Sequence, residues 1–283
     1  MLVSALGLLV GMLAIFYVDH KAQAPGAPVD TESSGLPLDT PVDESPVSSE
    51  VVALDKPVPP MLAIIVDDFG YGRSGTSTIL ELPYPLTLSV LPDLSMTKAD
   101  YERAVRSGHQ VILHLPMEPE GNGVSPGERA ITVGMTEDEI RQTIEAFLEQ
   151  VPAVGAANNH MGSRATADEG VMRVVIEVLK EHGMYWIDSS TTPDSKGPDV
   201  CRALGVPVVI NNMFLDWEVT EEYIQDRLLA AAERARRKGY AVAIGHVSRI
   251  FADTLAAVLP KIAGSGVTLV TVDQLVDYLG YRY

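Results

Sequence analysis

The stretch AIIVDDFGYG, residues 63–72, places two adjacent aspartates directly after an apolar run. Together with Met61 and Leu62, the apolar residues form the segment MLAIIV, and a continuous run of this kind is typical of a strand buried on both faces. Neighbouring carboxylates repel each other unless a cation or a shared proton relieves the repulsion. Asp68 alone could cap a turn. The pair Asp67–Asp68, however, favours a bound divalent metal, with one aspartate as its ligand and the other left as a base.

From this stretch to its end, the chain alternates apolar runs with segments of helical period. Strands are predicted at residues 61–66, 86–92, 110–116, 184–188, 206–210, 240–246 and 267–273, and helices at 136–151, 166–183, 220–238 and about 251–263. The capping-box pairs Thr136–Glu139 and Thr166–Glu169 start the first two helices, and Gly183 ends the second. Seven or so strands alternating with helices predict one parallel α/β domain. A barrel is favoured over an open doubly wound sheet, although periodicity alone does not choose between them.

The N-terminal 60 residues have a different composition. Residues 1–18 contain no charged side chain, so segment 1–20 is predicted to be a membrane anchor or a signal segment. A small-residue motif, AQA at 22–24, could be a cleavage site, but we favour an uncleaved anchor. Residues 21–60 are rich in Pro, Ser and acidic residues and are predicted to be a disordered linker. The folded domain is therefore expected at 61–283, in the periplasm or otherwise outside the cytoplasm, tethered to the inner membrane.

The composition argues against several classes of protein. The formal net charge of −17 argues against a nucleic-acid partner, because phosphate recognition needs clustered Lys and Arg. The single cysteine, Cys201, excludes an internal disulfide framework and a multi-cysteine zinc site. The sequence contains no G-x-G-x-x-G or Walker-type loop, so dinucleotide and P-loop functions lose their main support.

Polar residues that a core does not explain follow the predicted strands. His114 ends one strand and is followed four residues later by Glu118, while His160 lies in NNHMGS, residues 158–163. Asp188 ends MYWID, and His246 ends YAVAIGH. Working residues collect at the carboxyl ends of strands in parallel α/β folds. His114 alone could be a core histidine and Glu118 a solvated loop charge, but their concentration at strand ends predicts an active site.

These motifs resemble those of the polysaccharide deacetylases of the NodB-homology group, carbohydrate esterase family 4. IIVDDFGYG looks like the TFDDGP motif that opens that family, and SGHQVILHLPME is similar to its second motif. The segment after residue 162 echoes the arginine–proline–glycine segment, and VAIGH resembles the last motif, a strand that ends in histidine. The order holds over roughly residues 61–273. The sequence most resembles the divergent polysaccharide deacetylase branch, the YibQ-like proteins, in which VDDFG and NNHMGS are themselves signatures.

The resemblance implies a distorted (β/α) barrel of about seven strands that removes N- or O-acetyl groups from a glycan with a divalent metal, most often zinc. By position, Asp67 would be the general base and Asp68 a metal ligand. His114 would be a second ligand, and His246 would act as the general acid. These roles are consistent with zinc chemistry, in which carboxylate and imidazole ligands leave an open coordination position.

The sequence departs from the family pattern at two places. Glu118 stands where the family has its second metal histidine, and NNHMGS replaces the arginine–proline motif that orients the base. Either Glu118 binds the metal, or His160 reaches in from the neighbouring loop to complete an Asp–His–His set, which we favour. Asp188 is expected to orient His246 or His160.

Four further residues are candidate substrate contacts. Asn158 and Asn159 could anchor their loop or contact sugar hydroxyls, and Ser163 lies in the same motif. Trp217 could stack on a sugar ring or pack in the core. The partner is expected to be a glycan or cell-wall polysaccharide, while the sequence leaves the oligomeric state open.

Three functions are compatible with these features. The favoured one is a metal-dependent deacetylase of the cell envelope. The main alternative is an inactive domain that binds glycan or scaffolds envelope proteins while keeping the fold. A third is hydrolysis of another amide or ester. A purely structural domain has no need of the pair Asp67–Asp68, which favours an enzyme.

Overall fold

The computed structural model describes residues 59–121, 123 and 125–280. The predicted anchor, 1–20, lies outside these residues, as does the predicted linker up to residue 58. Within the described part of the chain, no helix is both long and apolar enough to cross a membrane. The compact unit begins at Pro59.

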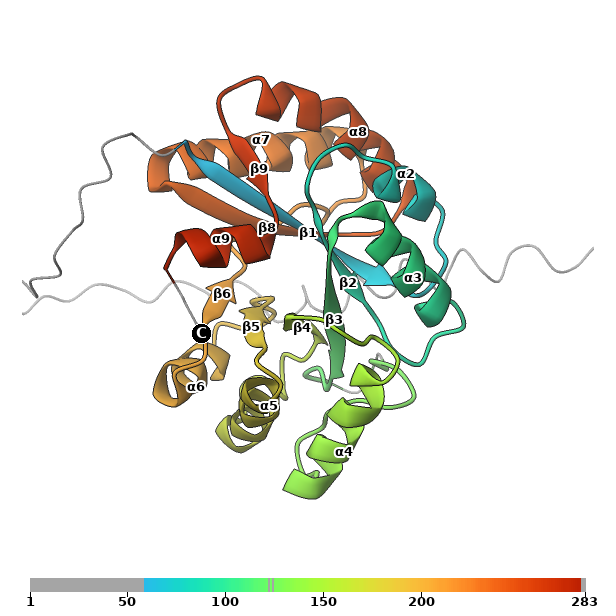
Figure 1. Cartoon of the computed structure of the whole chain (residues 1–283), viewed down its shortest axis with the longest axis vertical. Coiled ribbons are helices and arrows are strands. Elements are labelled where there is room, and N and C mark those ends of the chain that lie inside the picture. Colours follow the sequence, from blue (N-terminus) through green and yellow to red (C-terminus); the bar gives the residue numbers. More distant parts are fainter. Residues whose placement is uncertain (1–58, 122, 124, 281–283) are drawn as a thin grey trace, which may run out of the picture. The chain divides into compact units, whose positions relative to one another are not determined.

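The described residues form strands and helices that largely alternate along the chain (Figure 1). The strands are β1 Met61–Phe69, β2 Thr87–Val90, β3 Gln110–Met117, β4 Ala156–Met161, β5 Tyr185–Asp188, β6 Val208–Ile210, β7 Met213–Phe214, β8 Tyr240–His246 and β9 Thr268–Val270. The helices are α2 Thr76–Leu80, α3 Thr97–Ser107, α4 Glu137–Leu148, α5 Glu169–Glu181, α6 Gly197–Leu204, α7 Glu221–Lys238, α8 Arg249–Ala263 and α9 Val272–Tyr278.

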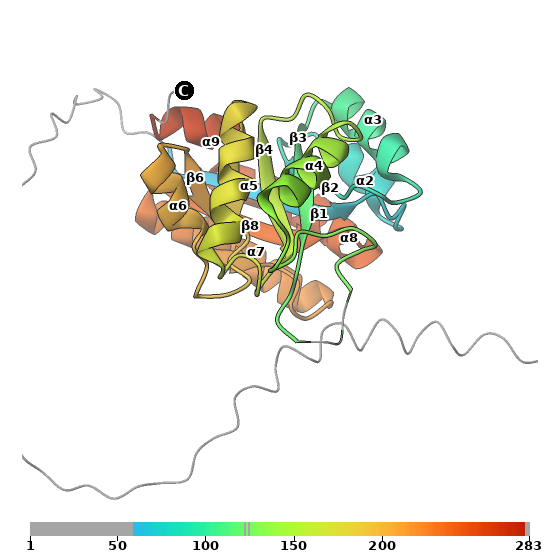
Figure 2. The same ribbon diagram turned by 90° about the horizontal axis from the view of Figure 1, so that it is seen from below.

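The strands form one curled parallel sheet. Its order is β6-β5-β4-β3-β2-β1-β8-β7, and β9 pairs with the first residues of β1, on the edge that β2 occupies farther along. Figures 1 and 2 show the helices other than α9 arranged around the outside of the curved sheet. The ends of this path, β6 and β7, are joined by Asn211 and Asn212, whose backbone N–H groups donate to Asp188 O on β5 and Val242 O on β8. The predicted distorted (β/α) barrel is confirmed, in the form of an open half-barrel.

Alternation along β1 determines which side chains enter the barrel. Leu62, Ile64 and Val66 belong to the core between the sheet and the outer helices. Ala63 and Ile65 belong to a second core inside the curved sheet. Because successive strand residues point to opposite faces, Asp67 continues the inner set. The hydrophobic pattern of β1 therefore directs a carboxylate into the carboxyl end of the barrel.

The structure adds α2, α3, α6 and β7 to the predicted elements, and three further details differ from the prediction. The box Thr136–Glu139 caps α4 as predicted, but Asp168, not Thr166, is the N-cap of α5, because its side chain accepts from Val171 N. Asn158 to Met161 lie in strand β4 and not in a loop. The strand predicted to reach residue 273 ends at Val270, because a capping box at Thr271 starts α9.

Helix α9 closes the amino end of the barrel. Its side chains Val272, Leu275 and Val276 belong to the inner core. Asp273 Oδ1 accepts hydrogen bonds of 2.7 Å from Gln110 Nε2 and from Tyr185 Oη, at the starts of β3 and β5. The opposite, carboxyl end of the strands is therefore the end at which a site can form.

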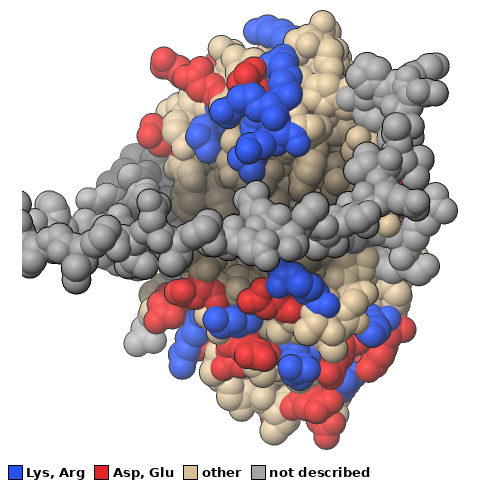
Figure 3. Space-filling view, turned by 90° about the vertical axis from the view of Figure 1, so that its left-hand side faces the viewer, with Lys and Arg blue, Asp and Glu red and all other residues tan. Residues whose placement is uncertain are grey.

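Charged side chains are unevenly distributed over the face seen in Figure 3, which lies at the left of Figure 1. Lys and Arg gather in its upper part, and both signs mix in its lower part. On α7, the last turn carries Arg236, Arg237 and Lys238. Cations at this position complement the partial negative charge of a helix C-terminus, so the basic turn needs no anionic partner to explain it.

Candidate active site

The paired aspartates lie at the carboxyl end of β1. Asp67 is directly opposite His246 in the register of β1 and β8. Asp68 has φ 71°, a left-handed conformation that costs a non-glycine residue about 1–3 kcal/mol and is most often retained at functional sites. The following loop is held by the fully buried carboxylate of Asp100, which accepts from Gly70 N at 3.0 Å. The backbone thus fixes two carboxylates at one strand end.

Three side chains from different strands meet as a possible metal site. Ligand atoms of Asp68, His114 and His160 all lie within 4.8 Å of one another. His160 Nδ1 is 3.2 Å from His114 Nε2 and 3.4 Å from Asp68 Oδ1, and His114 Nε2 is 3.7 Å from Asp68 Oδ1. Bonds of about 2.0–2.2 Å in a tetrahedral zinc site separate ligand atoms by roughly 3.3–3.6 Å. The spacing fits a zinc ion.

The hydrogen bonding of Asp68 fits the same site. Its Oδ1 atom is buried and has no hydrogen-bond partner, which is costly for a carboxylate oxygen unless a cation binds there. The other oxygen, Oδ2, is 3.1 Å from Arg73 Nη1. The guanidinium therefore holds one oxygen and leaves the other directed at the two imidazoles.

Glu118 lies outside this group. Its Oε1 atom is 2.7 Å from Arg164 Nη1, and its Oε2 atom accepts from Val133 N at 2.7 Å. Both oxygens are thus used in fixing the segment after β3. Of the two third ligands that the sequence left open, the geometry brings in His160, from strand β4 and not from a loop.

A buried asparagine connects the base to the metal site. Asn158 Nδ2 donates to Asp67 Oδ1 at 3.0 Å, and Asn158 Oδ1 lies 2.8 Å from His114 Nδ1. Ser89 Oγ, from β2, donates to the same amide oxygen at 2.5 Å. Asn158 is fully buried, and of the two roles that the sequence left open, anchoring its segment or contacting sugar hydroxyls, its contacts match the first.

The carboxylate that holds His246 is Asp216, just after β7. Asp216 Oδ2 accepts from His246 N at 2.7 Å, and Asp216 Oδ1 is 3.1 Å from His246 Nδ1. Asp188, which the sequence assigned to a histidine, instead accepts from Ser190 N at 2.8 Å and from Ser195 Oγ at 2.6 Å. The prediction for Asp188 is corrected, because both of its oxygens fix the loop after β5.

The pKa values of the two aspartates of β1 are shifted in opposite directions. Burial raises the pKa of Asp67 to about 7, although His246 and Asn158 oppose the shift. Burial alone would also raise the pKa of Asp68, but His160, His246 and Arg73 hold it well below its usual range. A pair of carboxylates with separated pKa values is the pattern expected of one ligand and one base.

The pKa values of His114 and His246 are also shifted in opposite directions. Burial and the neighbouring His160 lower the pKa of His114 to about 3, so the ring is neutral, as a metal ligand requires. Burial alone would lower the pKa of His246, but Asp216, Asp68 and Asp67 raise it to about 10. His246 is therefore protonated at neutral pH and is chemically suited to donate a proton.

The raised pKa of His246 makes the free energy of unfolding depend on pH. The folded-state pKa of His246 is above its ordinary value of 6.5, so its stabilisation is complete below about pH 6.5 and is lost as pH rises through about 10. We expect Asp216→Asn to lower the free energy of unfolding of the metal-free chain more at about pH 6 than at about pH 10. Urea unfolding of parent and variant at both pH values measures this, and an equal loss at both would contradict it.

The remaining predicted contacts fall into two groups. Asn159 is buried, with its Oδ1 accepting from Ser189 N at 2.9 Å and its Nδ2 donating to Met161 O at 2.6 Å, so it anchors the backbone and does not face a sugar. Ser163 Oγ accepts from Glu120 N in the same structural way. Trp217 is 47% exposed, which excludes the core alternative.

Sequence reasoning missed three residues of this site, Asp216, Arg73 and Ser89. Asp216 directly precedes Trp217 and carries no distinctive sequence signal of its own. Its strand, β7, has only two residues, which is too short for a periodic pattern. Arg73 and Ser89 carry no local signal, because their roles depend on which strands are adjacent.

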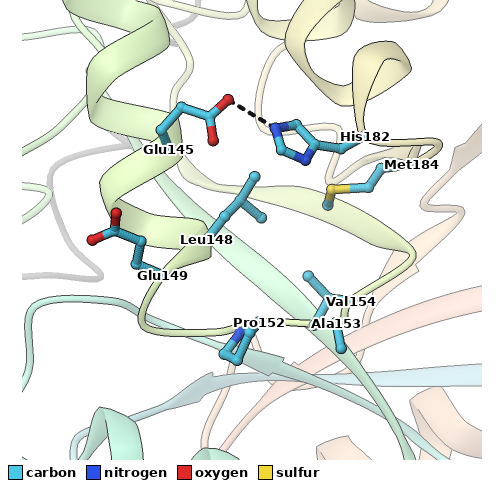
Figure 4. Close-up of a pocket in the computed structure, with 8 residues that line it drawn as sticks. All are labelled: Glu145, Leu148, Glu149, Pro152, Ala153, Val154, His182 and Met184. Carbon is cyan, nitrogen blue, oxygen red and sulfur yellow. Dashed lines mark hydrogen bonds and ion pairs between the residues drawn. The ribbon is translucent and has the colours of Figure 1, made fainter.

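A surface pocket lies away from these residues (Figure 4). Its lining includes Glu145, Leu148, His182 and Met184, from the end of α4, the end of α5 and the segment just before β5. His182 Nε2 is 2.8 Å from Glu145 Oε1, as the dashed line in Figure 4 marks. None of the candidate site residues lines it, so the chemistry of the site gives it no role.

The sequence is similar to those of known proteins. It matches the family described as divergent polysaccharide deacetylase over residues 64–276. The Escherichia coli K12 protein YibQ is 34% identical over 198 residues, which cover 69% of this chain and 61% of that protein. A Haemophilus influenzae Rd protein is 29% identical over 185 residues, covering 65% of this chain and 66% of that protein. The chain therefore spans somewhat less than two thirds of the length of both relatives.

Solved structures show the same fold. An uncharacterized protein from Agrobacterium tumefaciens C58 has a TM-score of 0.74 at 23% identity, covering 77% of this chain and 89% of that one. A CE4 family pseudoenzyme from Bacillus anthracis has a TM-score of 0.52 at 12% identity, covering 78% and 66%. With its match over residues 64–276, the chain belongs to the divergent polysaccharide deacetylase family.

Proposed function

We propose that this protein is a metal-dependent hydrolase of the cell envelope that removes N- or O-acetyl groups from a glycan. The observation that carries the proposal is the group Asp68–His114–His160, placed beside Asp67, whose pKa is raised to about 7. A candidate metal site next to a buried base is the arrangement that hydrolysis of an amide or ester needs.

The metal would be held by Asp68 Oδ1, His114 Nε2 and His160 Nδ1, and zinc suits this set of donors best. When bound, zinc would acidify a water molecule and polarise the acetyl carbonyl. Asp67, oriented by Asn158, accepts the proton of the attacking water at a carboxylate oxygen. Its raised pKa places proton transfer near neutral pH, where a base works best.

His246 supplies the proton for the leaving group. Asp216 contacts Nδ1, which leaves Nε2 as the nitrogen able to give a proton to the departing amine or alkoxide. The His246 side chain is 27% exposed, so a substrate can reach it. Base and acid thus come from facing positions of β1 and β8.

Aromatic side chains beside His246 support a sugar substrate. The ring of Phe214 stacks on that of His246 with a centroid distance of 6.2 Å, and Trp217 packs edge-on against Phe214 at 5.1 Å. Trp217 is 47% exposed, and an indole at the surface can pack against the apolar face of a sugar ring. The proposed location outside the cytoplasm, with residues 1–20 as an anchor, follows from the uncharged N-terminal segment alone.

The second candidate is an inactive domain that binds glycan. It is favoured by the shared fold with a protein described as a CE4 family pseudoenzyme, since this fold persists there without activity. In that case the metal, the aromatic pair and the acidic strand ends would serve binding or structure only.

Acetate release separates the two functions. The purified chain, with one equivalent of zinc or with chelator, is incubated with acetylated chitooligosaccharides, acetylated xylan and peptidoglycan fragments. The hydrolase predicts zinc-dependent acetate from at least one of them. Binding of a glycan with no acetate from any, in a chain that carries zinc, would support the inactive domain and contradict the enzyme.

A further inference from the structure

Asn158 makes five polar contacts, an unusually complete set for one buried amide. Its Nδ2 donates to Asp67 Oδ1 at 3.0 Å, to Asp67 Oδ2 at 3.2 Å and to Ser189 Oγ at 3.3 Å. Its Oδ1 accepts a hydrogen bond of 2.5 Å from Ser89 Oγ and lies 2.8 Å from His114 Nδ1. These partners come from β1, β2, β3 and the residue after β5, while Asn158 itself lies on β4.

The contacts decide which way the amide points. The structure directs the NH₂ group at both oxygens of Asp67, and once Asp67 has lost its proton only this orientation of the amide satisfies them, because a carboxylate only accepts hydrogen bonds. The amide oxygen then faces His114, and because that oxygen can only accept, the proton of the neutral imidazole must be on Nδ1. His114 Nε2 is left with a free lone pair, and this is the atom that faces Asp68 and His160.

We infer that Asn158 is a positioning residue that fixes the tautomer of His114 and the orientation of Asp67 through one planar amide. The part that concerns the metal rests on the proposed function, whereas the tautomer does not. Partners behind metal-bound histidines select the ring nitrogen that binds and typically contribute 10–100-fold to metal affinity. Here the Asn158 amide also bonds to the base Asp67, so His114 and Asp67 keep a fixed position relative to each other.

The neighbouring asparagine provides a matched control. Asn159 is equally buried on the same strand, but its amide contacts Ser189 N, Met161 O and Thr191 Oγ1. It therefore represents a buried asparagine that only satisfies polar groups of the backbone and loop. Asn158→Ala and Asn159→Ala remove the same side chain at adjacent positions, and only the first removes contacts to Asp67 and His114.

The tautomer is measured directly on the full chain. In metal-free protein with ¹⁵N-labelled histidine, long-range ¹H–¹⁵N correlation should show His114 with its proton on Nδ1. Asn158→Ala should shift the ring toward the other tautomer, and Asn159→Ala should not. If Asn158→Ala does not fold, Ser89→Ala is measured in its place. It removes the second group that bonds to Asn158 Oδ1 but leaves that oxygen facing His114 Nδ1, so it should keep the parent tautomer.

Zinc affinity is the second readout, measured by competition with a chelator. We expect Asn158→Ala to weaken zinc binding about 10–100-fold and Asn159→Ala to stay within error of the parent. Asn158→Ala with the tautomer and zinc affinity of the parent would overturn the inference, as would an equal loss in Asn159→Ala. If the parent binds zinc but releases no acetate, the proposed function fails and this inference stands. If the parent binds no zinc, the tautomer of His114 in parent and variants alone decides whether the inference about Asn158 holds.

Discussion

Asp67→Asn should reduce zinc-dependent acetate release by at least about 100-fold while leaving the zinc content of the chain unchanged. The substitution removes the base but preserves the shape of the side chain, and an amide oxygen can still accept from Asn158 Nδ2. Asp67 is not in the group that could hold the metal, so the ion should remain. The measurement is kcat/KM with the substrate found in the acetate assay, beside zinc per chain.

Asp188→Asn is the matched control for this experiment. Asp188 is also a buried aspartate at a strand end, but its oxygens accept from Ser190 and Ser195. Its substitution should cost stability and less than about tenfold in activity. Equal losses in the two variants would mean that Asp67 acts through the fold and not as a base.

The pH profile of the parent carries the same information. Because the pKa of Asp67 is raised to about 7 before any cation binds, activity should rise with pH as this group loses its proton. A bound cation stabilises the carboxylate, so the rise in the zinc-loaded chain should be centred at or below about pH 7. At the alkaline end, activity should fall as His246 loses its proton, at or below the pKa of about 10 that it has before any cation binds, because a cation at Asp68 offsets part of the negative charge that raises this pKa.

The second large loss of activity is expected for His246→Gln. Glutamine cannot act as a general acid, so the variant has no group at this position to protonate the leaving group. Loss of a general acid typically costs 10²–10⁴-fold, and the loss should be largest for substrates with a poor leaving group, such as an N-acetyl amine. An activated ester, whose alkoxide leaves without a proton, should be cleaved nearly as fast by the variant as by the parent.

His182→Gln is the control for a histidine change. His182 is exposed and pairs with Glu145 in the surface pocket of Figure 4, outside the candidate site. Its substitution should leave both substrates unaffected. If His246→Gln lost activity equally on the amide and on the activated ester, the role of proton donor would be contradicted.

The ends of the strands could be predicted because they obey a general rule of parallel sheets. Asp67, His114 and His246 each follow an apolar run, and such ends meet at one edge. The continuous run of β1 and the histidine at the end of β8 were enough to predict their convergence. Their facing positions in the register of the two strands confirm that Asp67 and His246 are neighbours.

The details that failed depend on register and on short elements. His160 seemed to belong to a loop, because AANNHM lacks the apolar run of a buried strand, yet it pairs beside β3. For Asn158 the sequence left open a loop anchor and a sugar contact, because it does not show that polar partners from four other strand ends converge on this buried side chain. Asp216 was hidden after the two-residue strand β7. In each case the structure depends on contacts between strands distant in sequence, which local patterns do not encode.

The most direct test of the site is the metal content of the purified chain, measured by elemental mass spectrometry after zinc loading and removal of excess ion. The parent should hold about one zinc per chain, the number expected for a single site with three protein ligands. His114→Ala and His160→Ala should lose it, and Glu118→Gln should keep it, since both Glu118 oxygens are bonded elsewhere. A parent without zinc, or a metal lost with Glu118→Gln and kept with His160→Ala, would contradict the Asp68–His114–His160 site.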